Sequence, residues 1–172
     1  FTGNGQAPYF QQTVNNKIEI TLDDKTHNLI GTIQIKYTNN SPDELTIIYM
    51  HLWPNAYKNT ETAFAKQQVR TGSTGFYFAE ASRLGRISKL NFAVNGKEVK
   101  FESDPKHEDI GIVHLNAPLK SGETITITTP FEVKIPNSFS RLGRVGQSYQ
   151  MTQWYPKPAV YDRNGWHPMP YL

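Results

Sequence analysis

The fold is decided by the stretch Lys17-Ile18-Glu19-Ile20-Thr21-Leu22-Asp23, in which apolar and polar side chains alternate. Successive side chains of a β-strand point to opposite faces of a sheet, so this alternation predicts a strand with one apolar and one polar face. The same pattern recurs at residues 32–38, 124–128 and 131–135. Such strands are typical of antiparallel sheets that rest one face on a core and leave the other in water.

The segment Leu45–Leu52 differs, because apolar residues occupy both of its faces. A strand with two apolar faces is covered on both sides by the rest of the protein. We therefore expect a central strand here.

Turn residues separate these strands. Asp23–Thr26 divides the first two, and Asn39–Asp43 ends the second. Asn95-Gly96 joins Leu90–Val94 to Lys97–Phe101, and this dipeptide is the strongest short signal for a β-hairpin. The pattern thus predicts a chain of short strands joined by tight turns.

Helix signals are few. Residues 60–69 can form one or two helical turns, and residues 70–85 are expected to form an irregular loop with a short strand at Phe76–Phe78. The Gly- and Arg-containing stretch 140–146 is expected to be a flexible connector before a strand at 147–152. The predicted fold class is all-β, an antiparallel β-sandwich or a saddle-shaped curved sheet with at most one short helix.

Length and composition exclude several classes of protein. The 172 residues fit one β domain, residues 1–172. The 18 basic and 15 acidic residues are interspersed, so we expect no nucleic-acid partner. No apolar run reaches the roughly 20 residues of a membrane-spanning helix, so we expect no membrane span. The absence of cysteine removes disulfides, thiolate nucleophiles and cysteine-bound zinc.

The side chains that could carry chemistry are scattered. None of the five histidines is two or four residues from another, the spacings that aim two imidazoles at one metal. His51 lies in the central strand, where a hydrogen-bonded core imidazole is expected. The carboxylates between Glu102 and Asp109 fit a solvated rim, and no serine lies in a G-x-S-x-G elbow. We therefore predict no catalytic and no metal-binding residue.

The C-terminal run Gln153–Leu172 is unusual, because it holds four prolines and five aromatic residues. Proline at this density allows neither a helix nor a central strand. The run could be a flap over the domain's own core, an interface to a missing domain, or one wall of a binding cleft. Neither end of the chain has the sequence of a natural terminus, so we expect a fragment of a larger protein.

Three stretches carry a resemblance to a known family: Tyr49–Tyr57, Leu115–Glu123 and Gln153–Leu172. With the strands around them they resemble the N-terminal domain of the aminopeptidase N-like zinc metallopeptidases. The likeness is closest to bacterial, exported members, and it extends from about residue 17 onward.

The resemblance implies a role for the whole domain. In this family a saddle-shaped β domain packs on a thermolysin-like catalytic domain that binds zinc through H-E-x-x-H. This sequence contains no H-E-x-x-H, so the resemblance places zinc and all catalytic residues in a downstream domain to which 153–172 lead. The expected partners are that catalytic domain and a peptide substrate, the expected location is secreted or periplasmic, and the fragment alone is expected to be inactive.

The resemblance also implies two substrate-binding residues, Gln153 and Tyr155. The family holds the free α-amine of the substrate with a Gln-x-Glu or Gln-x-Gln pair. The carbonyl oxygen of Gln153 can accept a hydrogen bond from an ammonium group. Tyr155 departs from the family pattern, and a neutral phenol binds ammonium more weakly than a carboxylate does. The alternative is that both residues simply end a strand.

Two other functions remain open. The chain could be a stand-alone carbohydrate-binding or adhesion sandwich that stacks sugars on Trp154, Tyr155, Tyr161 and Trp166. It could also be a self-contained hydrolase that uses His107 or His167.

Overall fold

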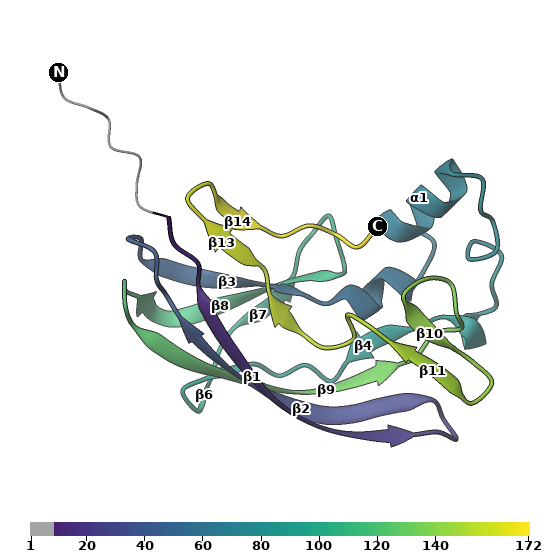
Figure 1. Ribbon diagram of the computed structural model, residues 1–172, viewed down its shortest axis with the longest axis horizontal. Helices are drawn as coiled ribbons and strands as arrows, with labels where there is room; N and C mark the ends of the chain where they lie inside the picture. The colour runs from purple at the N-terminus through teal and green to yellow at the C-terminus, as the bar shows by residue number, and fades with distance from the viewer. Residues whose placement is uncertain (1–8) are drawn as a thin grey trace.

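The structure is a computed structural model that describes residues 9–172, which form two packed β-sheets (Figure 1). The large sheet has the strand order β1-β2-β9-β5-β6, with β4 also paired to β9. Its strands are β1 (Thr13–Asp23), β2 (Asn28–Thr38), β4 (Arg86–Ser88), β5 (Ala93–Val94), β6 (Lys97–Glu98) and β9 (Thr124–Lys134).

The small sheet has the order β12-β3-β8-β7. Its strands are β3 (Leu45–His51), β7 (Phe101–Ser103), β8 (Ile110–Leu119) and β12 (Lys157–Pro158). Two further hairpins are β10 (Leu142–Val145) with β11 (Ser148–Met151), and β13 (Val160–Asp162) with β14 (Gly165–His167). The helices are α1 (Ala63–Arg70) and the 3₁₀ turns η1 (Trp53–Tyr57) and η2 (Ala81–Arg83).

The core lies between the two sheets, where the alternating strands of the large sheet turn their apolar faces inward. Ile35 on β2 stands opposite Ile127 on β9, and both are fully buried. The polar residues between them, such as Gln34 and Thr128, lie on the outer face. The strands of both sheets pair antiparallel, so the expected all-β antiparallel sandwich with at most one short helix is confirmed.

Strand β3 is central, as its two apolar faces predict. It pairs with β8 on one side and β12 on the other. Ile48 and Met50 face the core, whereas the ring of Tyr49 on the opposite face lies 5.8 Å from that of Trp166 in β14. In Figure 1 the yellow β13–β14 hairpin accordingly lies over β3.

The predicted turns are present. Strand β1 ends at Asp23, and the side chain of Asp23 accepts hydrogen bonds from the backbone amides of Lys25 and Thr26. Asn95 and Gly96 adopt φ of 50° and 78°, as a tight hairpin turn requires, and they join β5 to β6. This hairpin is confirmed, although its strands are shorter than the sequence predicts.

The predicted short strand at Phe76–Phe78 is wrong, because these residues form a turn. Phe76 is drawn into an aromatic cluster, with its ring 5.2 Å from Phe64 and 5.0 Å from Phe139. Side-chain packing, rather than strand pairing, therefore fixes this loop. The flexible connector expected at 140–146 is also wrong, since β10 and β11 form a paired hairpin there.

The predicted helix is confirmed as α1, which begins three residues after the predicted start. Thr62 caps it by accepting a hydrogen bond from the amide of Ala65.

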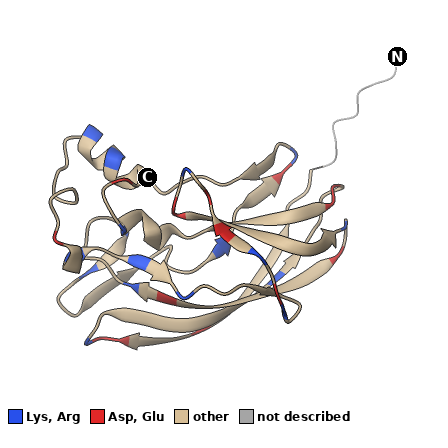
Figure 2. Ribbon diagram, turned by 180° about the vertical axis from the view of Figure 1, so that it is seen from behind, with Lys and Arg blue, Asp and Glu red and all other residues tan. Residues whose placement is uncertain are grey.

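Within residues 9–172, every helix is too short or too polar to cross a membrane. In Figure 2, which shows the molecule from behind, acidic and basic residues lie interspersed along strands and loops.

Candidate functional site

The C-terminal run lies against the outer face of the small sheet and then returns to α1. β12 pairs with the end of β3, with Lys157 opposite His51. The last residues are held by Tyr171, whose amide donates to Asp109 Oδ2 over 2.6 Å and whose ring is buried beside those of Tyr57 and Phe64. The proline-rich run thus forms only short strands at an edge and in a hairpin, as its composition predicts.

Gln153 lies between β11 and β12 in an uncommon backbone conformation. Its φ is 56°, in the left-handed region that few residues other than glycine adopt. The side chain is half-buried, and its Oε1 atom is covered without a hydrogen-bond partner among the described residues. A covered, unpaired carbonyl oxygen is costly, so this residue is a candidate acceptor for a donor from outside the chain.

Tyr155 follows two residues later and is also half-buried. The ring of Trp154 meets that of Tyr155 at 70° with the centroids 5.1 Å apart, and Trp154 lies 6.1 Å from Phe131 of the core. Gln153 and Tyr155 therefore lie on one connection, but Oε1 of Gln153 accepts no hydrogen bond from Tyr155.

A second group of unusual side chains lies beside this connection. The imidazole of His51 stacks on the ring of Trp53 at 4.5 Å, and Nζ of Lys157 lies 3.8 Å from the centre of the same ring. Burial first, and Lys157 second, lower the pKa of His51 to about 4, so the ring is neutral at pH 7. Burial also lowers the pKa of Lys157.

His51 is buried as expected, but its ring lacks a well-formed hydrogen bond within residues 9–172. The residue is 7% exposed, and neither ring nitrogen has a partner of normal hydrogen-bond geometry in the described chain. A weak contact with the backbone of His167 partly opposes the lowering of its pKa. The sequence held one signal for this arrangement, because His51 and Trp53 are two residues apart and can share a face of the strand end. The third member, Lys157, is too distant in sequence to be found this way.

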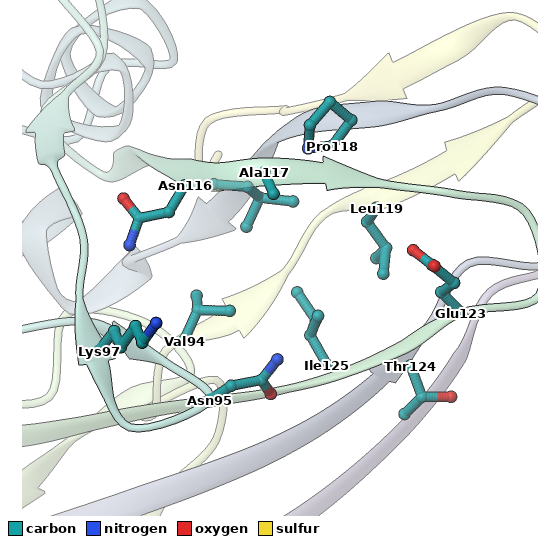
Figure 3. A pocket seen from close by; sticks show the side chains of 11 residues that line it. Val94, Asn95, Lys97, Asn116, Ala117, Pro118, Leu119, Glu123, Thr124 and Ile125 are labelled. Carbon is teal, nitrogen blue, oxygen red and sulfur yellow. The ribbon is translucent and has the colours of Figure 1, made fainter.

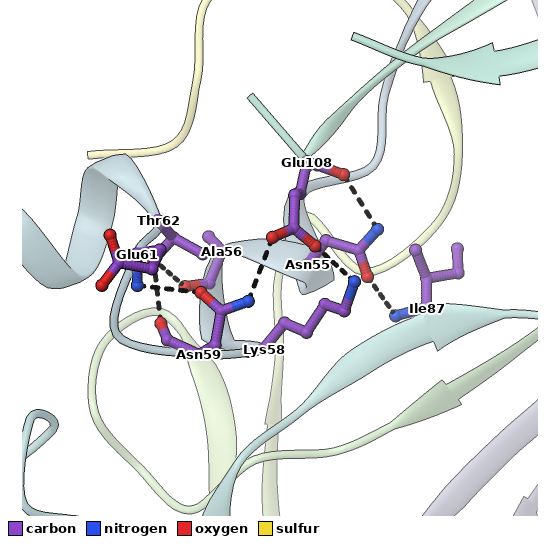
Figure 4. A network of polar contacts seen from close by, with 8 residues as sticks. All are labelled: Asn55, Ala56, Lys58, Asn59, Glu61, Thr62, Ile87 and Glu108. Atoms are coloured by element: carbon purple, nitrogen blue, oxygen red, sulfur yellow. Dashed lines mark hydrogen bonds and ion pairs between the residues drawn. The ribbon is translucent and has the colours of Figure 1, made fainter. Parts of the chain in front are cut away.

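The carboxylates at 102–109 are separated by their own contacts. Glu102 accepts from His114 and Lys100, each over 2.8 Å. Glu108 is paired with Lys58 and accepts from Asn59 Nδ2 over 3.0 Å (Figure 4), and these two contacts lower its pKa. Each of these groups is thus engaged in fixing the loops rather than free for acid–base work.

The expectation of a solvated rim is wrong for Asp109. It is buried, and burial raises the pKa of its carboxyl above the ordinary value. Its hydrogen bond from the Tyr171 amide ties the C-terminal run to the loop before β8. Among residues 9–172, no three His, Asp or Glu side chains gather closely enough to hold a metal ion.

A cleft of about 480 Å³ lies elsewhere, at an open edge of the sandwich. Figure 3 shows Leu119 from β8 and Ile125 from β9 pointing toward each other across it, with Val94 beside Ile125. Lys97 and Glu123 are the charged residues of its lining. The cleft can hold a small apolar group, but it does not include Gln153 or Tyr155.

A comparison with protein-family models gave no match, and a comparison with curated proteins gave none either.

Proposed function

We propose that this chain is the N-terminal, non-catalytic β domain of an exported, zinc-dependent aminopeptidase-like metallopeptidase. The domain shapes the substrate cleft, and zinc is bound by a catalytic domain that follows it. The observation that carries the proposal is Gln153, with its left-handed backbone and its unpaired carbonyl oxygen. Support also comes from the resemblance of the run 153–172 to the segment that leads to the catalytic domain in this family.

The geometry of Gln153 suits the binding of an amine. A left-handed backbone costs about 1 kcal/mol at a residue with a side chain. A buried acceptor without a donor costs a further 1–3 kcal/mol or so. A substrate ammonium group that donates to Oε1 removes the second cost, after a side-chain rotation that uncovers the oxygen. Tyr155, on the same connection, would supply a phenol oxygen as a weaker second acceptor.

The packing of the aromatic residues gives less support to a carbohydrate-binding module. Trp154, Tyr155, Tyr161 and Trp166 are all half-buried against the core or one another. Tyr161 and Trp166 meet at 58° with 5.0 Å between their centroids, so they do not form a flat platform. A screen against a glycan array is expected to give no binding.

The test uses the product of the complete reading frame and aminoacyl-coumarin substrates, with and without a chelator. The proposal expects amine release that the chelator abolishes and added zinc restores. A full-length protein that binds zinc stoichiometrically but releases no product would overturn it.

The role of Gln153 is tested separately, with the variant Q153A in the same protein. Loss of one hydrogen bond to an ammonium group should lower kcat/KM by about 10- to 100-fold, chiefly through KM. Replacement of Gln150, an exposed residue of β11, by Ala is the matched control and should leave kcat/KM unchanged. An unchanged KM in Q153A would remove Gln153 from the proposal without affecting the zinc test.

A further inference from the structure

Strand β1 forms one edge of the large sheet and pairs with β2 along its entire length (Figure 1). No other strand of residues 9–172 pairs with its free side. An edge strand presents a row of backbone N–H and C=O groups that can pair with another strand. β1 spans 11 residues, which is long for such an edge.

The usual protections of an edge strand are absent from β1. Proteins shield edges with proline, bulges, short strands or an unbalanced charge, lysine above all. β1 contains no proline, and its register with β2 runs without a shift from Thr13 to Asp23. Lys17 is balanced by Glu19, which lies 2.9 Å away on the same face.

The face of β1 that carries the apolar side chains is also partly exposed to solvent. The alternation of β1 predicts, by contrast, that this face packs on the core. Ile18 packs against the core, but Val14, Ile20 and Leu22 are 38%, 45% and 43% exposed. These three side chains lie on the same face as Tyr37, Gly31 and Leu29 of β2. Apolar side chains of this kind, next to a free edge, can be partly buried against the side chains of a strand that pairs with that edge.

The sequence of β1 is complementary to itself. When two copies of β1 pair antiparallel with Ile18 opposite Ile18, Lys17 of one copy faces Glu19 of the other. By symmetry, Glu19 of the first copy also faces Lys17 of the second. In the same register Val14 faces Leu22, and all 11 residues of each strand overlap. Opposite charges and apolar pairs that face one another each stabilise a sheet.

Other registers are worse for physical reasons. A shift of one residue turns the apolar face of one copy to the polar face of the other. A shift of two residues either way places Lys17 opposite Lys17, or Glu19 opposite Glu19, and like charges directly opposite destabilise a sheet. Larger shifts shorten the overlap.

We propose that this chain associates with a second copy of itself through β1, as a two-fold symmetric dimer in which the two large sheets become one. A symmetric dimer requires a patch that is complementary to itself, and β1 meets this requirement in charge, in apolar pattern and in length. The inference concerns the 172-residue chain and does not depend on the proposed peptidase role.

The first test measures the association of the chain by sedimentation equilibrium up to about 1 mM. K17E and E19K each place two pairs of like charges across the interface. Both residues are about 70% exposed, so neither change affects the core. Each variant alone should associate at least ~10-fold more weakly than the wild-type chain. An equimolar mixture of K17E and E19K should recover the dimer, because every charge then faces its opposite.

The matched control is K36E, which reverses an exposed charge on β2, one strand away from the edge. This variant should associate as the wild-type chain does. A wild-type chain that stays monomeric at 1 mM overturns the proposal. A dimer that K17E and E19K leave unchanged, or that their mixture does not restore, also overturns it.

The register is tested with single cysteines, since the chain has none of its own. I18C should form a disulfide-linked dimer under mild oxidation, because residues directly opposite in an antiparallel pair lie within disulfide distance. N16C should not, because Asn16 faces Ile20 of the second copy. Equal cross-linking of I18C and N16C would contradict this register.

Discussion

The imidazole of His51 stacks on Trp53 near the cation of Lys157, and neither ring nitrogen makes a hydrogen bond of normal geometry within residues 9–172. Its surroundings favour the neutral ring, since a charge there would lose its hydration and face a second positive charge. The unfolded chain gives the same histidine an ordinary pKa near 6.5. Folding therefore opposes protonation of this residue.

This difference makes the stability of the chain depend on pH. The folded pKa of His51, about 4, lies below the unfolded value. Between these two values the unfolded chain binds the proton more readily, so stability falls as pH falls from about 6.5 to 4. The loss from His51 alone is expected to be about 3 kcal/mol.

The variant H51F isolates this effect, because it keeps an aromatic ring and removes the titrating group. At pH 7 it should be at least as stable as the wild-type chain, since two unpaired nitrogens are removed. Urea unfolding of both chains at pH 7 and pH 4 is the measurement. If the wild-type chain loses no more stability than H51F, the pKa of His51 is not lowered by folding.

At the scale of the element, Gly31 controls how closely β1 approaches β2. A Cβ atom at this position would lie 2.2 Å from the carbonyl oxygen of Glu19 and 2.7 Å from Cγ2 of Ile20. The first of these atoms belongs to the backbone and cannot move aside without displacing the strand. The pairing of β1 and β2 thus requires a residue without a side chain at position 31.

We expect G31A to destabilise the chain by about 2 kcal/mol, the typical cost of forcing a methyl group into a filled space. Hydrogen exchange of the β1 amides should quicken in the same variant. The control is G75A, since a Cβ atom there would meet no atom within 4 Å. If the stability and the hydrogen-exchange rates of G31A are unchanged, β1 and β2 pack less closely at this position than the structure shows.

At the scale of the whole molecule, the chain is held together by contact between the two sheets. β9 shows the division within one strand, because Ile127 is fully buried toward the small sheet and its neighbour Thr128 lies on the outer face. The Figure 4 network adds a polar connection, in which Asn55 donates to the Glu108 carbonyl and accepts from the Ile87 amide, each over 3.0 Å.

Shortening a side chain to alanine should destabilise the protein more on the buried face of β9 than on its outer face. I127A is expected to lower the free energy of unfolding by 2–5 kcal/mol or so, through lost apolar burial and the cavity that remains. T128A should change it by less than about 0.5 kcal/mol. Urea denaturation of both variants measures the difference, and similar losses would mean that the small sheet does not cover β9 at this point.

The sequence predicted those features that depend on neighbouring residues. Alternation gave the strands and their apolar faces, the Asn95-Gly96 pair gave a hairpin, and the two apolar faces of 45–52 gave the central position of β3. The prolines of the C-terminal run excluded a helix and a central strand. Each of these features follows from backbone geometry over a few residues.

Tertiary structure decided what depends on contact between distant residues. It placed Lys157 beside His51, buried Asp109 under the amide of Tyr171, and left the carbonyl oxygen of Gln153 without a hydrogen-bond partner among residues 9–172. It also left the apolar face of β1 open, although the alternation of β1 is the same as that of the covered strand β2. Alternation determines which side chains share a face, but whether another layer covers that face depends on how the two sheets pack.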